Sequence, residues 1–232
     1  MRLFTSLPAL AIAALGTVLL LLTPAAQAQT YSNAAAINVP TSTSDGRGTP
    51  YPSTITVFGA PASIGYLSVT LSGFSHTFVS DVRVLLVSPT GQKILLMAGT
   101  NGFGDATNNT LTFIPDGTAL LPSSGQNVVS GIYACSVYFG RETVSIPAPA
   151  PGAPYGTTLA PLFGTNANGT WNLYVWDGFP SADDGFFAGG WSISFNETPS
   201  LPVTTAFTYQ GTLRGAGGLP ITGDANVRFT LW

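Results

Sequence analysis

Four aspartates have the residue type and the placement that suit metal binding: Asp81, Asp105, Asp177 and Asp184. Each lies in a loop or at the end of a segment whose apolar residues recur at every second position, as in a strand. Calcium takes about six to eight hard oxygen ligands, which carboxylates and loop carbonyls supply. The four aspartates are therefore candidate ligands of a structural Ca²⁺. The alternative is that they cap turns through hydrogen bonds to the backbone.

Catalysis by a histidine base would rest on His76, the single histidine of the chain. A serine-protease triad also needs a nucleophile beside that base, and the sequence contains no Gly-x-Ser-x-Gly elbow and no subtilisin-type blocks. Asp183 and Asp184 are paired in sequence, but adjacent side chains in a loop point apart, whereas a glycosidase needs two carboxyl groups flanking one bond. We therefore predict no catalytic residue and interpret His76 as a turn residue.

The aromatic residues near the end of the alternating region fall into two groups. Trp171 and Trp191 share the phase of apolar strand neighbours, so we expect both indoles in the core. Tyr174, Trp176 and Phe179 are out of phase or in a loop. They form either an exposed patch for a sugar or a protein, or contacts with a second sheet or with the insertion around residues 135–151.

The elements that must position these side chains are strands. Only 7% of the residues are charged, and Lys and Glu, which usually cover the outer faces of helices, are scarce. Alternation predicts strands over residues 54–57, 67–72, 82–87, 171–175 and 191–195, so the chain is all-β. The strand over 82–87 is apolar on most of both faces and is expected to be central in its sheet.

The connections are predicted from glycine and proline. Residues 88–91, Ser-Pro-Thr-Gly, suit a tight turn that leads into a strand over 93–99. We expect a loop at 101–109 before a short strand over 111–114. Prolines make residues 145–156 an extended surface crossing. Cys135, the single cysteine, lies in an apolar stretch and is interpreted as a small buried side chain, not a reactive thiol.

The two ends of the chain are predicted to lie outside the main domain. Residues 1–28 read as a secretory signal, with an apolar run from Leu7 and a small-x-small cleavage pattern at 26–28. Export would make the protein secreted, extracellular or part of the cell envelope, with no membrane span after cleavage. Residues 29–53 are polar and interpreted as a flexible lead-in. Residues 198–232 are expected to form a linker and a partial β-hairpin extension.

The charge pattern argues against nucleic acid and anionic membranes as main partners. The formal net charge is −3, and removing Arg2 with the signal leaves six basic and ten acidic residues. These charges are scattered, and no basic patch can be read from the sequence.

Several motifs together carry a family resemblance. The pattern N-G-T-W-x-L-x-V-x-D begins at Asn168 and ends at Asp177, and it is followed by matches at Asp184, Gly185, Trp191, Ile193 and Phe195. Residues 76–91 match a pattern H-T-x-x-x-D-L-x-V-x-L-x-S-P-x-G, with His76, Asp81, Ser88, Pro89 and Gly91 in place. In these positions the chain resembles the P domain, or P/Homo B domain, of kexin- and furin-like proprotein convertases, which also occurs in bacterial exported proteins.

The resemblance implies a jelly-roll β-sandwich of the galactose-binding-domain-like type over residues 54–197. It implies a non-catalytic role in stabilisation, attachment, or binding of a protein or glycan at the cell surface. Structural calcium is implied as well, although Ile114 and Pro115 stand where the family has acids. The alternative is an accessory domain of a secreted serine endopeptidase whose catalytic part is absent from this chain. Because convertase P domains follow the catalytic domain, whereas this one follows the signal, the first role is favoured.

Overall fold

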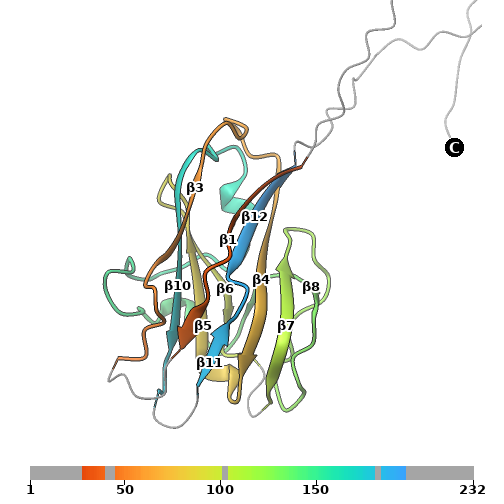
Figure 1. The fold of residues 1–232 in the computed structure, drawn as a ribbon, viewed down its shortest axis with the longest axis vertical. Coiled ribbons are helices and arrows are strands. Elements are labelled where there is room, and N and C mark those ends of the chain that lie inside the picture. Colours follow the sequence, from red (N-terminus) through yellow and green to blue (C-terminus); the bar gives the residue numbers. More distant parts are fainter. Residues whose placement is uncertain (1–27, 40–44, 101–103, 181–183, 197–232) are drawn as a thin grey trace, which may run out of the picture. The chain divides into compact units, whose positions relative to one another are not determined.

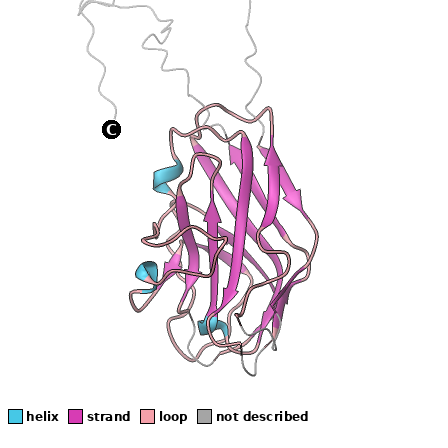
Figure 2. Ribbon diagram, turned by 90° about the vertical axis from the view of Figure 1, so that its left-hand side faces the viewer, coloured by secondary structure: helices cyan, strands magenta, loops and turns pink. Residues whose placement is uncertain are grey.

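The computed structural model describes residues 28–39, 45–100, 104–180 and 184–196. The chain divides into two units, residues 1–198 and 199–232. The second unit and the signal segment 1–27 lie outside the described residues, and so does the expected hairpin extension. The described part of the first unit is all-β and consists of two sheets, as predicted, with short 3-10 turns in its loops (Figures 1 and 2).

The larger sheet has seven strands and is organised around the long strand β4 (Tyr66–His76). Along one edge of β4 lie β12 (Trp191–Asn196) and then β11 (Gly185–Phe187). These two strands pair in turn with β1 (Gln29–Asn33) and β2 (Ile37–Val39). The other edge of β4 pairs with β7 (Ala106–Phe113), which is followed by the parallel strand β8 (Gly131–Tyr133).

The smaller sheet has five strands in the order β3-β10-β5-β6-β9. Their bounds are Ser53–Val57, Gly169–Asp177, Val82–Val87, Lys93–Ala98 and Ser136–Val137. Strand β5 is central, as expected from its apolar faces. The turn at 88–91 is also confirmed, since Gly91 N donates to Ser88 O and Gly91 has a φ of 84°. Turns η1 (Val79–Asp81), η2 (Arg141–Thr143) and η3 (Ala160–Leu162) lie in the connections.

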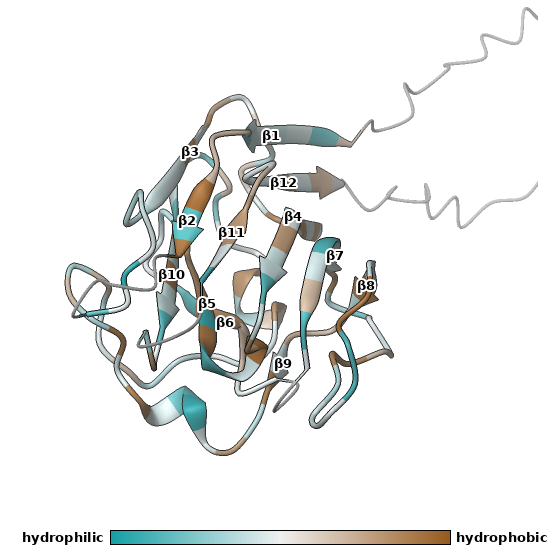
Figure 3. Cartoon of the chain, turned by 60° about the horizontal axis from the view of Figure 1, so that its bottom comes forward, coloured by the Kyte–Doolittle hydropathy of each residue, from teal (hydrophilic) through white to brown (hydrophobic). Residues whose placement is uncertain are grey.

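The main core lies between the two sheets and follows from the alternation. Strand β3 buries Ser53, Ile55 and Val57 and exposes the two threonines between them. Trp171 and Trp191 are both fully buried in the apolar core, which confirms the prediction. Figure 3 shows the same alternation in β2, where two hydrophobic residues flank one hydrophilic residue.

A second apolar cluster covers the outer face of the smaller sheet. Residues 138–156 cross this face and bury Ile146, Ala150 and Tyr155 against the outward side chains Leu85 and Tyr174. Hydrogen bonds tie the crossing down, because Tyr51 Oη donates to Pro147 O at 2.7 Å and Tyr155 N donates to Glu142 O at 3.0 Å. The proline-rich stretch is a surface crossing, as predicted. Because it covers the outer face of the smaller sheet, the outward side chain of Leu85 on β5 is also buried.

Two expectations about local structure are wrong. The flexible lead-in predicted for 29–53 contains β1 and β2, which complete the larger sheet by pairing with β12 and β11. Strand β7 begins at Ala106, inside the loop that the sequence predicted for 101–109, because β4 offers its free edge to these polar residues. In both cases backbone pairing with a distant strand outweighs a polar local composition. No helix long and apolar enough to span a membrane occurs among the described residues.

Candidate functional site: an arginine pocket beside a buried His–Asp pair

His76 and Asp177 form a buried pair where β4 and β10 end. Both side chains have 0% exposure, and His76 Nε2 lies 3.4 Å from Asp177 Oδ2. This separation is longer than an ordinary hydrogen bond, and neither atom has another hydrogen-bond partner within the described part of the chain. The imidazole is also stacked beside Phe74, with ring centroids 6.5 Å apart.

The pair organises the two turns that follow it in sequence. Phe78 N donates to His76 Nδ1 at 3.0 Å, and Phe179 N donates to Asp177 Oδ1 at 2.7 Å. Because Nδ1 accepts a hydrogen bond, the proton of the neutral imidazole lies on Nε2, which faces the aspartate. Gly178 N also donates to Asp81 O at 2.8 Å and ties the two turns together. The prediction of His76 as a turn residue is corrected: His76 is the last residue of β4, and its side chain accepts a hydrogen bond from the turn that follows.

A serine-protease triad does not match this geometry. In a triad the second nitrogen of the imidazole faces a serine hydroxyl, whereas in this chain it accepts the backbone N–H of Phe78. The buried pair therefore positions Phe78 and Phe179 instead of a nucleophile.

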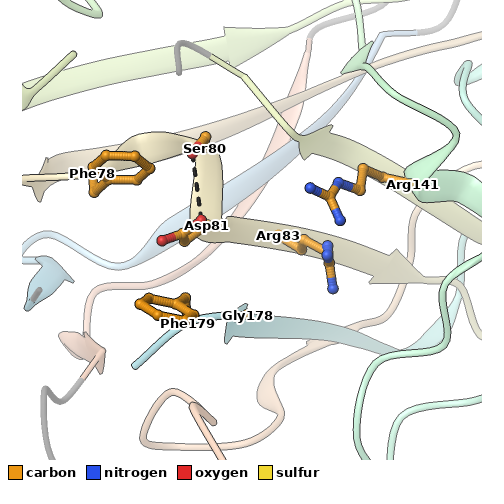
Figure 4. Close-up of a pocket in the computed structure, with 7 residues that line it drawn as sticks. All are labelled: Phe78, Ser80, Asp81, Arg83, Arg141, Gly178 and Phe179. Atoms are coloured by element: carbon orange, nitrogen blue, oxygen red, sulfur yellow. Dashed lines mark hydrogen bonds between the residues drawn. The ribbon is translucent and has the colours of Figure 1, made fainter. Parts of the chain in front are cut away.

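These two turns border a pocket of about 430 Å³ beside the start of β5. We call it the arginine pocket, and its lining consists of Phe78, Ser80, Asp81, Arg83, Arg141, Gly178 and Phe179. Figure 4 shows the two guanidinium groups on one side, the two phenyl rings on the other, and Ser80 and Asp81 between them. Two of the four Lys and Arg residues in the described ranges line this one pocket.

Arg83 is the most unusual residue of the pocket, because it is only 5% exposed. It points outward from β5, directly opposite Trp176 on β10, and its Cζ lies 4.3 Å from the centroid of the Trp176 ring. Its Nε and Nη1 atoms have no hydrogen-bond partner within the described residues. A buried guanidinium without a full set of partners costs free energy.

Arg141 brings a second positive charge to the same place. It begins η2, and it lies beside Gly99, where an added Cβ would come 3.2 Å from Arg141 Cγ. Burial and, second, the charge of Arg141 lower the pKa of Arg83 to about 10, while Asp81 acts in the opposite direction more weakly than Arg141. Tyr155 and Asp177 also act in the direction of Asp81. Arg83 is therefore a cation at neutral pH, with a second cation beside it.

The apolar side of the pocket is partly open to solvent. Phe179 is 62% exposed although its backbone is held by Asp177. Between the rings and the arginines, Ser80 Oγ donates to Asp81 Oδ1 at 3.4 Å, a long and weak hydrogen bond. The site thus combines two cations, one carboxylate and two phenyl rings within one small volume.

The four predicted calcium ligands are not brought into one group. Asp177 is buried with His76, Asp81 lines the arginine pocket, and Asp105 and Asp184 are exposed. Among the described residues, no three His, Cys, Asp or Glu side chains converge as metal ligands do. Calcium stays a sequence prediction that a melting experiment with calcium and with a chelator tests; Asp183 lies outside the described residues.

The other predicted candidates are also placed. Tyr174 is buried in the second cluster, and Trp176 donates from Nε1 to Asp45 O at 2.7 Å, so the interpretation as packing contacts is confirmed for these two. Cys135 packs against the core, and burial raises the pKa of its thiol to about 12, as expected for an unreactive cysteine. Sequence reasoning missed Arg83 and Arg141. The signal that could have indicated Arg83 was its charge inside the otherwise apolar run 82–87.

Comparisons with known proteins add little to this geometry. No protein-family model matches the chain, and a search of curated proteins finds no match. Among solved structures, the chain is similar to a chain in the crystal structure of Aeromonas sobria serine protease in complex with the chaperone ORF2, with 14% identity and a TM-score of 0.32. The match covers 75% of this chain and 28% of the other, so this chain spans little more than a quarter of that protein's length.

Proposed function

We propose that this chain is a non-catalytic binding module of a secreted or cell-surface protein, and that the arginine pocket is its ligand site. The proposal includes a jelly-roll sandwich of the P-domain type, for which the sequence motifs are the support. It also includes export, for which the signal-like residues 1–28 are the support. The partner is a protein or glycan that presents an anionic group.

The observation that carries this proposal is the state of the Arg83 side chain. A residue that only stabilised the outer face of the smaller sheet could be apolar, as Leu85 is two positions later. Arg83 instead buries a charge with two unpaired nitrogens next to a second arginine. An anion bound in the pocket would place a further negative charge beside this guanidinium and offset part of the cost of its burial.

Titration of the arginine side chains tests the proposal directly. Nitrogen-15 NMR spectra of the purified mature protein resolve the arginine Nε–H groups, and sodium acetate serves as the anion. We expect saturable shifts of Arg83 and Arg141 and unchanged signals for Arg47, which is paired with Asp45 outside the pocket. Equal, non-saturating shifts of all three arginines would show general ionic strength effects and overturn the proposal.

A further inference from the structure

The two halves of the arginine pocket lie side by side, which restricts the ligand. The guanidinium groups of Arg83 and Arg141 occupy one side, and the rings of Phe78 and Phe179 occupy the other (Figure 4). A ligand that uses both halves must carry an anionic group and an apolar group within a few bonds of each other.

The anionic group is best matched by a carboxylate. A guanidinium presents parallel N–H donors that fit the two oxygens of a planar carboxylate. Arg83 is also held in place by its stack on Trp176, so less conformational freedom is lost when it binds.

The middle of the pocket adds a third requirement. The Asp81 carboxylate lies between the arginines and the rings, and it accepts a weak hydrogen bond from Ser80 at 3.4 Å. A carboxylate has about four lone-pair sites, so in the proposed pose Asp81 accepts the N–H of the ligand in addition to the partners that it already has. It would repel a ligand that presented a second anion at this position.

These three requirements are met by one arrangement of atoms. The α-carbon of an amino acid residue carries a carboxylate, an N–H and a side chain, all within two bonds. We propose that the arginine pocket binds the α-carboxylate of a residue with an apolar side chain, at the carboxyl terminus of a peptide or in a free amino acid. In this pose the carboxylate faces Arg83 and Arg141, the N–H faces Asp81, and the side chain packs on Phe78 and Phe179. The proposal rests on the ligand site named under Proposed function.

An acidic polysaccharide fits this lining less well. Sugar rings need several hydrogen-bonding groups for their hydroxyls, whereas Ser80 and Asp81 are the only polar side chains besides the two arginines among the described residues of the lining. An internal Asp or Glu side chain lacks an apolar branch on the carbon next to its carboxylate, so it cannot use both halves at once.

The test measures binding of four small probes to the mature protein by calorimetry and by the same NMR signals. The probes are N-acetyl-phenylalanine, N-acetyl-phenylalaninamide, phenylalanine and acetate. We expect N-acetyl-phenylalanine or phenylalanine to bind with a Kd on the order of 1 mM, as a ligand of this size can. The amide should lose at least about tenfold because it has no charge.

The probes distinguish a peptide carboxyl terminus from a free amino acid as the ligand. They also distinguish failure of this inference from failure of the proposed anion site. Tighter binding of N-acetyl-phenylalanine assigns the pocket to peptide carboxyl termini, and tighter binding of phenylalanine assigns it to free amino acids. Acetate that binds at Arg83 as tightly as either would overturn this inference while leaving the anion site intact. If no probe shifts the Arg83 signal, both proposals fail.

Three variants localise the binding. Arg83→Met keeps an unbranched stem against Trp176 and removes the charge, so we expect an affinity loss of about 10- to 100-fold. Gly178→Ala adds a Cβ that would lie 3.5 Å from Arg83 Nη2, an ordinary contact distance, so the fold tolerates it while access to the guanidinium narrows. Lys93→Gln removes a charge that binds Gly152 O outside the pocket and is the matched control. Unchanged binding in both pocket variants would refute the inference.

Discussion

The core between the sheets and the arginine pocket are built on the same strands, but they bury opposite kinds of side chain. Inward-facing residues of β5, such as Val82 and Val84, pack in the apolar core, whereas Arg83 between them is buried on the outer face as a charge. The core gains free energy from every apolar group that it removes from water. In the pocket region, burying charges that have few partners costs part of that free energy.

This difference separates the part of the molecule that stabilises the fold from the part that is suited to bind a ligand. Substitutions in the core should lower stability in proportion to lost packing. Substitutions in the pocket should leave stability unchanged or raise it, at the expense of binding. The buried His76–Asp177 pair is intermediate between these two cases. It is polar, but its side chains accept hydrogen bonds from the backbone of the two turns.

The largest effect is expected in the core. Trp171→Ala removes a fully buried indole whose Nε1 donates to Ala167 O at 2.8 Å, so unfolding should cost about 3–5 kcal/mol less. Urea unfolding followed by circular dichroism measures this loss. Thr170→Ala, at the exposed neighbour on β10, should stay within about 0.5 kcal/mol of the parent protein. A small loss at Trp171 would contradict a packed inter-sheet core.

The next effect concerns the space around the buried pair. A Cβ at Gly185 would lie 2.3 Å from Cδ2 of the buried His76 and 2.5 Å from Ser75 O. Gly185→Ala should therefore destabilise the protein by about 1–3 kcal/mol through overpacking. Gly152→Ala is the control, since its Cβ would meet only Ser145 Oγ at 3.7 Å. Equal melting temperatures for both variants would show that His76 does not occupy this position.

A smaller loss is expected from the pair itself. Asp177→Asn keeps an oxygen for Phe179 N but turns an amide donor toward His76 Nε2–H, so two buried donors face each other. The expected cost is about 1–2 kcal/mol of unfolding free energy. The exposed Asp105→Asn is the matched control. An Asp177→Asn variant as stable as the parent would mean that the contact between Asp177 and His76 contributes nothing to stability.

The smallest effect should have the opposite sign. Arg83→Met exchanges a buried charge for an apolar side chain, which leaves stability unchanged or raises it by up to about 2 kcal/mol. Loss of the cation–π contact with Trp176 reduces this gain by about 0.5–1 kcal/mol, although the Met side chain still packs on the ring. Denaturant titration and the binding assay on the same variant measure whether stability is kept while ligand affinity falls. A clear loss of stability would show that Arg83 is structural and would remove the contrast with the core.

The sequence alone determined the features that depend on neighbouring residues. Period-two alternation located most of β3, β5, β10 and β12, and the Ser-Pro-Thr-Gly turn set the β5–β6 hairpin. The phase of Trp171 and Trp191 assigned both to the core. These features are local, because the side-chain direction in a strand follows from the position in the repeat.

Tertiary structure decided which distant residues meet. Polar residues 29–33 became a strand because β12 was there to pair with them, and His76 met Asp177 because β4 and β10 end close together. Arg83 became a buried cation only when Trp176 on β10 and Arg141 on the surface crossing were placed beside it. Burial and electrostatics depend on every neighbour in space, and a pattern of nearby residues does not contain that information.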